Sequence, residues 1–249
     1  MIQTQGIHKT YADFQALQPL DLHVRHGEVF GFLGPNGAGK TTTIRILSGV
    51  LPPSGGSLSI DGVSMTDDPV QAKARIGYIP DRPYLYEKLT AREMLHFVGG
   101  LYGMAHEDIE SKGMGLLEQN DLQNFADRLI EGFSHGMKQR LTLSCALLHD
   151  PALLIVDEPM VGLDPRGARL VKRVFREICA SGELSVFLST HTLEVAEEVC
   201  DRIAIMNQGQ IVVRGTMDEL RVELDRPGSR LEEIFLRLTE EASAEETST

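Results

Sequence analysis

The stretch GFLGPNGAGKTTTIRIL, residues Gly31 to Leu47, places a glycine-rich turn between an apolar run and a helix-forming segment. From Gly34 to Thr41 the spacing is G-x-x-x-x-G-K-T, typical of a loop whose backbone N–H groups surround phosphate oxygens. Glycines allow the tight backbone path, and the positive end of the following helix attracts the anion. In this pattern Lys40 reaches the β- and γ-phosphates of a nucleotide, and the Thr41 hydroxyl binds Mg²⁺. The predicted nucleotide-binding residues of the loop are Gly34, Pro35, Asn36, Gly37, Ala38, Gly39, Lys40, Thr41 and Thr42.

Length and composition restrict the class of protein. The chain has 249 residues, 42% of them hydrophobic and 24% charged, which suits one large domain or two closely packed subdomains. The formal charge is −12, and no basic run or stripe is visible, so we expect no nucleic-acid partner. Residues 240–249 carry four glutamates among Ala, Ser and Thr, and they are predicted to form an acidic, disordered tail.

The cysteines and the apolar runs bear on the cellular compartment. Cys145, Cys179 and Cys200 are far apart and form no C-x-x-C pair, so we expect buried, reduced thiols and neither a zinc site nor a disulfide framework. The opening MIQTQGIHKTY lacks the apolar core of a signal peptide. No run approaches the roughly 18 apolar residues that cross a bilayer. We therefore expect a chain that is soluble by itself and reaches a membrane only through another protein.

Strand-like and helical segments alternate along most of the chain. Residues 1–80 show short strand patterns separated by turns that contain glycine. The segment EVFGFL before the phosphate loop is predicted to form a buried strand. From Leu89 to about His149 the pattern is helical, and it opens with Thr90 and Glu93 at capping-box spacing. Further strands are predicted at ALLIVD, LSVFLST and DRIAIMNQGQIVVRG, with a helix after Asp164 between the first two. The pattern favours an α/β core interrupted by a helical insertion.

The segment LLIVDEP supplies two carboxylates at the end of a predicted strand. Asp157 is placed to hold Mg²⁺, directly or through water, and Glu158 is the candidate base that polarises the attacking water. Taken alone, this pair would equally suit a solvated strand end. The phosphate loop favours the catalytic interpretation, because parallel α/β sheets bind ligands at the carboxyl ends of their strands.

The order of these motifs with GFSHGMKQRL, VGLDP and STH resembles the ATP-binding subunit of an ATP-binding cassette (ABC) transporter, from about Ile2 to Gly215. The resemblance implies a P-loop NTPase fold: a RecA-like, mainly parallel core with an antiparallel β subdomain and an inserted helical subdomain. It also implies ATP and Mg²⁺ as cofactors and ATPase activity. The implied division of the single domain 1–239 is 1–85 and 150–215 for the core with its β subdomain, 86–149 for the helical subdomain and 216–239 for a C-terminal helical extension.

In the family, two cassettes form a head-to-tail dimer that holds two ATP molecules between the phosphate loop of one copy and the signature motif of the other. The resemblance assigns Ser134 and Gly136 to the signature and His191 to the γ-phosphate contact. It assigns Asp164 to the loop that links the two sites. Tyr11 matches the aromatic that stacks on adenine, although a half-buried strand residue remains an alternative for it.

Two motifs depart from the family pattern. The signature usually reads L-S-G-G-Q, whereas this chain has Phe133-Ser134-His135-Gly136-Met137, which keeps the serine and the second glycine. In the lid-loop region IGYIPDRPYLYEKLT, Asp81 stands where the family usually has glutamine. Ionised aspartate only accepts hydrogen bonds, and it would add a third carboxylate near Asp157 and Glu158. We expect Asp81 to bind Mg²⁺, and either the metal absorbs this charge or the pKa of one carboxyl rises.

The resemblance also implies the partners. The lid loop with Tyr84, Leu85 and Tyr86 would line the groove that receives a short coupling helix of a separate membrane permease, although core packing is an equal alternative for each side chain. The implied site of action is the cytoplasmic face of the plasma membrane, with a homodimer or a heterodimer of cassettes. The sequence of this loop and the segment LEEIFLRLTEE resemble those of bacterial export-type (ABC-2-like) subunits more than those of importers.

Other functions within the superfamily fit this sequence less well. Chromosome-associated cassette ATPases need long coiled-coil arms, and the interval from Thr41 to Phe133 holds only a small helical subdomain. Translation-linked relatives carry two cassettes in a chain, and this chain has one phosphate loop. A regulatory subunit that binds ATP but hydrolyses it weakly is disfavoured by Glu158 and His191, while Asp81 leaves it open.

Overall fold

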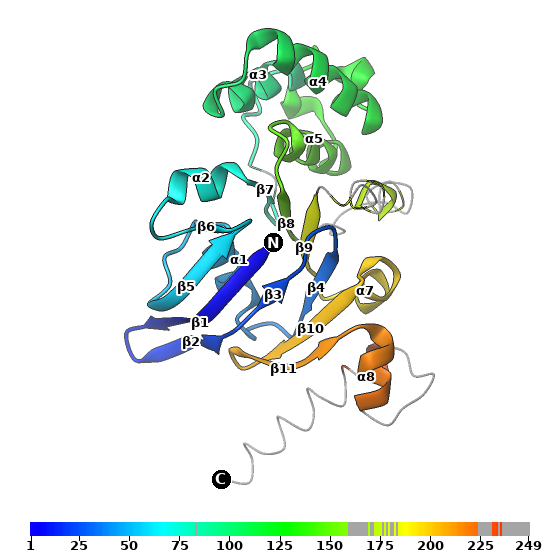
Figure 1. Cartoon of the computed structure of the whole chain (residues 1–249). Helices are drawn as coiled ribbons and strands as arrows, with labels where there is room; N and C mark the ends of the chain where they lie inside the picture. The colour runs from blue at the N-terminus through cyan, green and yellow to red at the C-terminus, as the bar shows by residue number, and fades with distance from the viewer. Residues whose placement is uncertain are drawn as a thin grey trace.

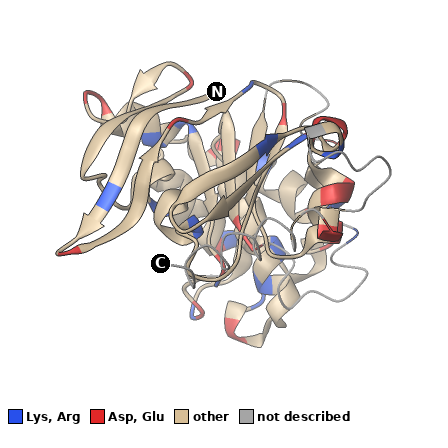
Figure 2. Ribbon diagram, turned by 90° about the horizontal axis from the view of Figure 1, so that it is seen from below, with Lys and Arg blue, Asp and Glu red and all other residues tan. Residues whose placement is uncertain are grey.

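The structure is a computed structural model of the whole chain, which describes residues 1–82, 84–158, 169, 172–175, 177, 179, 182, 184–223, 231–233 and 235. In Figure 1 a helical block lies above a parallel sheet, and a second, antiparallel sheet lies beside that sheet near the N-terminus. Basic and acidic residues are interspersed over the elements visible in Figure 2. The predicted α/β core with a helical insertion is therefore present.

The larger sheet has six strands in the order β11-β10-β4-β9-β8-β7. The strand pairs from β10 to β7 are parallel, and β10 and β11 form an antiparallel hairpin. The strands are β4 Val29–Leu33, β7 Ile76–Ile79, β8 Leu153–Asp157, β9 Ser185–Ser189, β10 Arg202–Asn207 and β11 Gln210–Gly215. Because the first five are parallel, the loops that follow them meet at one edge, where the phosphate loop and the DE pair also lie.

The central strands are apolar throughout because helices or the second sheet cover both of their faces. Leu153, Ile155 and Phe187 pack with α1 Lys40–Leu47 and the antiparallel sheet. Leu154 and Val156, on the other face of β8, pack in a cluster with residues of α5 His135–Leu147 and α7 Leu193–Val199 instead. Because successive side chains of a strand point to opposite faces of the sheet, the apolar side chains of β8 alternate between two separate core clusters.

The antiparallel sheet has the order β2-β1-β5-β6, with β3 also paired to β1. Gly56 adopts φ +84 where β5 crosses β1, and a Cβ there would lie 2.4 Å from the Gly6 carbonyl oxygen. Only glycine fits such a backbone approach. The strands are β1 Ile2–Tyr11, β2 Phe14–Leu20, β3 His23–Val24, β5 Gly55–Ile60 and β6 Val63–Ser64.

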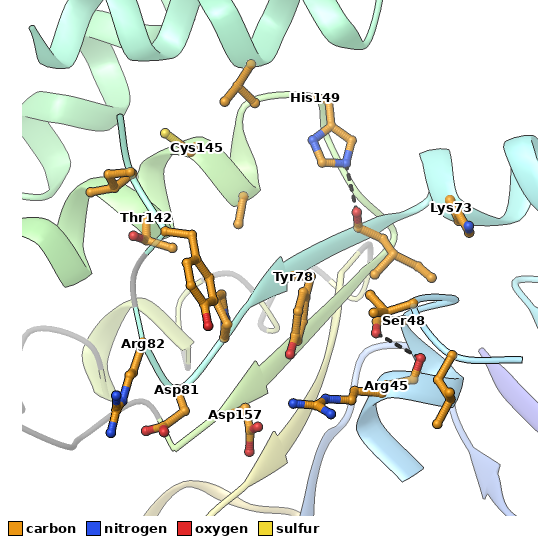
Figure 3. A pocket seen from close by; sticks show the side chains of 18 of the residues that line it. Arg45, Ser48, Lys73, Tyr78, Asp81, Arg82, Thr142, Cys145, His149 and Asp157 are labelled. Carbon is orange, nitrogen blue, oxygen red and sulfur yellow. Dashed lines mark hydrogen bonds between the residues drawn. The ribbon is translucent and has the colours of Figure 1, made fainter. Parts of the chain in front are cut away.

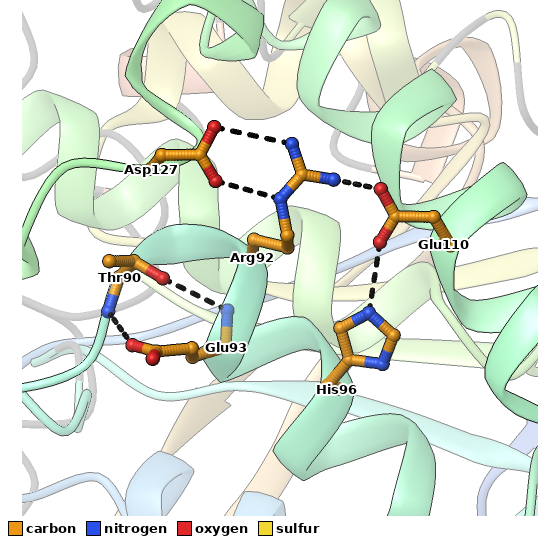
Figure 4. Close-up of polar contacts among 6 residues, drawn as sticks. All are labelled: Thr90, Arg92, Glu93, His96, Glu110 and Asp127. Atoms are coloured by element: carbon orange, nitrogen blue, oxygen red, sulfur yellow. Dashed lines mark hydrogen bonds and ion pairs between the residues drawn. The ribbon is translucent and has the colours of Figure 1, made fainter.

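The helical block has its own apolar core, which includes Met94, Leu117 and Leu141. Arg92 ties α3 to α4 through Glu110 and to the following turn through Asp127, with Nε 2.8 Å from Oδ1 (Figure 4). The block consists of α3 Ala91–Leu101, α4 His106–Gln119, the 3₁₀ turns η1 Gln123–Phe125 and η2 Ile130–Gly132, and α5 His135–Leu147. The remaining described helices are α2 Pro69–Ala74, α7 Leu193–Val199 and α8 Met217–Glu223.

The predicted capping box at the start of α3 is confirmed (Figure 4). The Glu93 backbone N–H donates to Thr90 Oγ1 at 3.2 Å, and the Thr90 N–H donates to Glu93 Oε2 at 2.8 Å. Thr90→Ala removes one of these bonds, so we expect the free energy of unfolding to fall by about 1 kcal/mol. Thermal denaturation should show a melting temperature lower by about 2–4 °C. The exposed control Thr66→Ala should stay within about 0.5 kcal/mol, and equal melting of the two variants would contradict the cap.

The cysteine prediction agrees with the described residues. Cys145 and Cys179 are buried free thiols, and Cys200 is a partly buried free thiol. Burial raises the pKa of the Cys145 thiol to about 12 and that of Cys179 to about 11, which keeps both protonated at neutral pH. None of the described helices combines the length and the apolar composition that a bilayer crossing requires.

Candidate nucleotide-binding site

The phosphate loop runs from the end of β4 to the first residue of α1. Gly39 caps the helix with φ +101, and a Cβ on Gly34 would lie 2.3 Å from the Met206 carbonyl oxygen. A Cβ on Gly37, by contrast, would meet no atom within 4 Å, so this side of the loop is open. The Gly209 N–H donates to the Ala38 carbonyl at 2.9 Å, which fastens the loop to the β10–β11 turn. The loop is thus held rigidly on one side and open on the other.

Lys40 lies inside the curl of this loop. Its Nζ donates to the carbonyl oxygens of Gly34 at 2.7 Å and Pro35 at 3.0 Å. Burial lowers the pKa of the Lys40 ammonium, and the carboxylates of Glu158 and Asp157 oppose that shift. An ammonium held by two carbonyl oxygens of the loop is placed to meet the oxygens of a triphosphate.

Asp157 ends strand β8 and is only 7% exposed. Burial raises the pKa of its carboxyl, and the nearby charges of Glu158 and Asp81 act in the same direction, while the Ser189 hydroxyl and Lys40 oppose them. The charges of Glu158 and Asp81 therefore add to a rise in the pKa of Asp157 whose largest cause is burial. A divalent cation between these groups would stabilise the ionised form.

Glu158 is held in an unusual backbone conformation. Its φ is +53, a left-handed value that costs a residue with a Cβ about 1 kcal/mol. Its backbone N–H donates to the Ser189 carbonyl at 3.0 Å. Its Oε2 lies 2.9 Å from Nδ1 of His191 and also accepts from the His191 backbone N–H at 3.3 Å. The segments after β8 and β9 therefore bring a carboxylate and an imidazole into contact at the strand edge.

A pocket of about 980 Å³ joins this edge to the helical block (Figure 3). Thr41, Asp81 and Asp157 all line it, and Figure 3 shows the two aspartates side by side. Among the described residues no group of three or more His, Cys, Asp and Glu side chains is arranged to hold a metal ion by itself. Proteins commonly bind Mg²⁺ through one or two carboxylates, waters and substrate phosphates, so this hydroxyl and these two carboxylates suit that ion.

Tyr11, Ser134 and Gly136 are not among the residues that line this pocket. Tyr11 ends β1 opposite Phe14, is 45% exposed, and has Lys9 Nζ 5.4 Å from its ring centroid. Ser134 caps α5, where its Oγ accepts from the Met137 N–H at 3.3 Å. None of the hydrogen bonds found among the described residues joins Ser134 or Gly136 to the phosphate loop. Asp164 and the helix expected after it lie largely outside the described residues.

Sequence reasoning did not single out several groups that line the same pocket. Arg45, Tyr78 and His149 contribute to its wall from α1, from β7 and from the end of α5. Burial raises the pKa of the Tyr78 phenol, and the charge of Asp157 adds to this shift. Arg45 follows Thr41 by four residues and therefore lies on the same face of α1. This spacing is the local sequence signal that could have identified Arg45 as a residue of the pocket.

Comparison with known proteins agrees with this geometry. The sequence profile of the family described as ABC transporter matches residues 17–161. The chain is 38% identical to the linearmycin resistance ATP-binding protein LnrL of Bacillus subtilis (strain 168), over 88% of this chain and 70% of that protein. It is 37% identical to the Nod factor export ATP-binding protein I of Cupriavidus pinatubonensis, over 88% of this chain and 67% of that protein.

A solved structure described as the ATP-binding subunit of an ABC transporter superposes with a TM-score of 0.89 and 34% identity, covering 96% of this chain and 99% of that one. The predicted fold class, a P-loop NTPase core with an antiparallel sheet and a helical insertion, is confirmed. ATP binding and the classification of the chain as an ATPase follow from the same likeness. The chain belongs to the ABC transporter family, as one of its ATP-binding subunits.

Proposed function

We propose that this subunit hydrolyses ATP to drive export through a separate membrane permease. The observation that supports catalysis most directly is the contact between Glu158 and His191, next to Asp157 and the phosphate loop. The relatives named for linearmycin resistance and for Nod factor export support the outward direction. Purified chain should release phosphate from ATP in the presence of Mg²⁺, and absence of hydrolysis with and without its permease would contradict the proposal.

In the proposed mechanism the side chains of the site bind the nucleotide or act on the attacking water. Lys40 and the loop N–H groups bind the β- and γ-phosphates, and Tyr11 stacks on adenine. Glu158 accepts a proton from the attacking water, and His191 orients that carboxylate and contacts the γ-phosphate. Bound Mg²⁺ would neutralise phosphate charge, held by the Thr41 hydroxyl, Asp157 and Asp81.

The role of Asp81 can be tested because aspartate and glutamine both offer an oxygen to the metal. Asp81→Ala should lower the Mg²⁺-dependent ATPase rate about tenfold and raise the Mg²⁺ concentration needed for half-maximal rate. Asp81→Gln should stay close to wild type. If Asp81→Ala hydrolyses as fast as wild type with the same Mg²⁺ dependence, Asp81 does not bind the metal. If wild type barely hydrolyses ATP and Asp81→Gln is faster, the chain is instead a regulatory subunit.

The proposed assembly is a head-to-tail dimer of cassettes, either two identical chains or two related ones. Ser134 and Gly136 stand at the N-terminus of α5, where a hydroxyl and free backbone N–H groups suit a γ-phosphate. We assign them to the nucleotide of the partner copy, as the head-to-tail arrangement of the family implies. Asp164 is assigned to the contact between the two sites.

We place the complex on the cytoplasmic face of the plasma membrane, where the permease anchors it. Tyr84 is 82% exposed and Tyr86 is 59% exposed, so these two aromatics are available to a partner, while Leu85 is partly buried against the core of the helical block. We assign residues 1–85 and 150–215 to the core with its β subdomain and residues 86–149 to the helical subdomain. Residues 216–239 then form the C-terminal extension of the single domain 1–239, followed by the acidic tail 240–249.

A further inference from the structure

Strand β2 passes the phosphate loop and begins, beside β1, with an exposed aromatic side chain. A Cβ on Gly39 would lie 2.8 Å from the Ala16 carbonyl oxygen, so the strand touches the end of the loop. The Gln18 N–H donates to the Gly209 carbonyl at 2.9 Å, and the Gly209 N–H donates to the Ala38 carbonyl of the loop. These contacts fix the position of β2 relative to the site for the phosphates.

Phe14 is the first residue of this strand, two positions before Ala16. At about 3.3 Å per residue, its backbone lies roughly 7 Å along β2 from the contact with the loop. The register pairs Phe14 directly with Tyr11 of β1, across the turn at residues 12–13 of the β1–β2 hairpin (Figure 1). This separation leaves room for the ribose of a nucleotide between the loop and the two aromatic side chains.

One face of the Tyr11 ring is already occupied. Lys9 Nζ lies over this ring, 5.4 Å from the centroid, and donates to the Pro52 carbonyl at 2.7 Å. An ammonium over the face of a tyrosine is attracted by the ring electrons, and the hydrogen bond to Pro52 holds the ammonium in place. The Tyr11 ring is thus positioned from one side, and because it is 45% exposed, a planar group can reach it from the other.

The Phe14 side chain is 68% exposed, although it is a large apolar group. Residues directly opposite each other on two antiparallel strands have Cβ atoms about 5 Å apart and share a face of the sheet. Among the residues that the structure describes, neither the Phe14 ring nor the Tyr11 ring stacks on another aromatic ring. Two neighbouring rings that are exposed and not stacked on each other offer apolar surface to a third ring.

We propose that Phe14 is a second base-binding residue, which contacts the adenine stacked on Tyr11 and sets a preference for purine over pyrimidine nucleotides. A purine has the larger face, so it gains more than a pyrimidine from contact with two aromatic side chains. A segment of a partner protein fits less well, because β2 is fastened to the phosphate loop and places both rings where the base of a bound nucleotide would lie. This assignment rests on the proposed function, in which Tyr11 stacks on adenine.

Isothermal titration calorimetry on the purified full-length chain tests this role with three ligands, each in the presence of Mg²⁺: ATP, UTP and inorganic tripolyphosphate. Phe14→Ala should weaken ATP binding about tenfold and UTP binding only about threefold, so the preference for ATP over UTP should shrink. Binding of tripolyphosphate should be unchanged, because this ligand has no base. Phe14→Tyr keeps an aromatic ring and should retain the wild-type affinities.

Leu101→Ala is the matched control. It removes another exposed apolar side chain, on α3 of the helical block, and should bind all three ligands as wild type does. Because Phe14 is exposed, the melting temperature of Phe14→Ala should also stay close to that of wild type.

Three results would each overturn the role of Phe14. Phe14→Ala would bind ATP as tightly as wild type, or lose affinity for ATP and UTP by the same factor, or lose affinity for tripolyphosphate as well. Phosphate release from ATP is measured in parallel. Hydrolysis by wild type with no loss of affinity in Phe14→Ala rejects the role of Phe14 alone. Absence of hydrolysis, with and without the permease, rejects the proposed function, and the affinities still decide whether Phe14 binds the base.

Discussion

Replacing Glu158 by glutamine should lower the ATPase rate about 100- to 1,000-fold while leaving the affinity for ATP nearly unchanged. The carboxylate lies 2.9 Å from His191 Nδ1 at the strand edge, and its left-handed backbone fixes its direction. Glutamine keeps the shape of the side chain and its contact with the His191 N–H but cannot accept the proton of the attacking water. The loss should therefore fall on the chemical step.

The measurement is phosphate release at saturating ATP and Mg²⁺, with ATP affinity taken from a separate binding titration. The matched control is Glu194→Gln, which neutralises an exposed acid on the neighbouring helix α7 and should hydrolyse ATP at the wild-type rate. A Glu158→Gln rate within a few-fold of wild type would show that another group accepts the proton.

Replacing Lys40 by methionine should weaken ATP binding by about 100-fold. The side chain keeps its length but loses the ammonium that lies within the loop, between the Gly34 and Pro35 carbonyl oxygens. Because the charged group contacts substrate phosphates in the proposed complex, the loss should appear in the dissociation constant of ATP. Isothermal titration calorimetry with ATP and Mg²⁺ measures it directly.

Lys73→Met is the control for this loss. It removes a cation on α2, away from the phosphate loop, so the ATP affinity of this variant should equal that of wild type. If Lys40→Met and Lys73→Met bind ATP equally well, the loop does not hold the phosphates through Lys40.

The fold was predictable wherever a signal is local. The G-x-x-x-x-G-K-T spacing identified the turn between β4 and α1, and the Thr90 and Glu93 pair identified the start of α3. The apolar run of β8 was recognisable because both of its faces are buried. Its two acids, Asp157 and Glu158, could be assigned to a site because parallel strands end at one edge.

The rest depends on contacts between segments that are distant in sequence. The pocket lined by Thr41 and Asp157 takes its cations from α1, α2 and the lid loop, and the pattern of a single segment does not reveal that these cations share one surface. The Tyr102–His149 stack joins residues that are 47 positions apart, counted from their numbers. Glu158 has a left-handed φ and donates its backbone N–H to the Ser189 carbonyl, a contact with a residue 31 positions later, counted from their numbers, which its local sequence does not reveal.

We propose that ATP joins two copies of this chain and that Glu158 is needed to release them. Light scattering of Glu158→Gln measures this most directly, because blocked hydrolysis should preserve the joined state. The account predicts a mass near that of one 27.5 kDa chain with ADP and Mg²⁺, and twice that mass with ATP and Mg²⁺. A single-chain mass with ATP and Mg²⁺, under conditions where ATP binding is saturated, would contradict it.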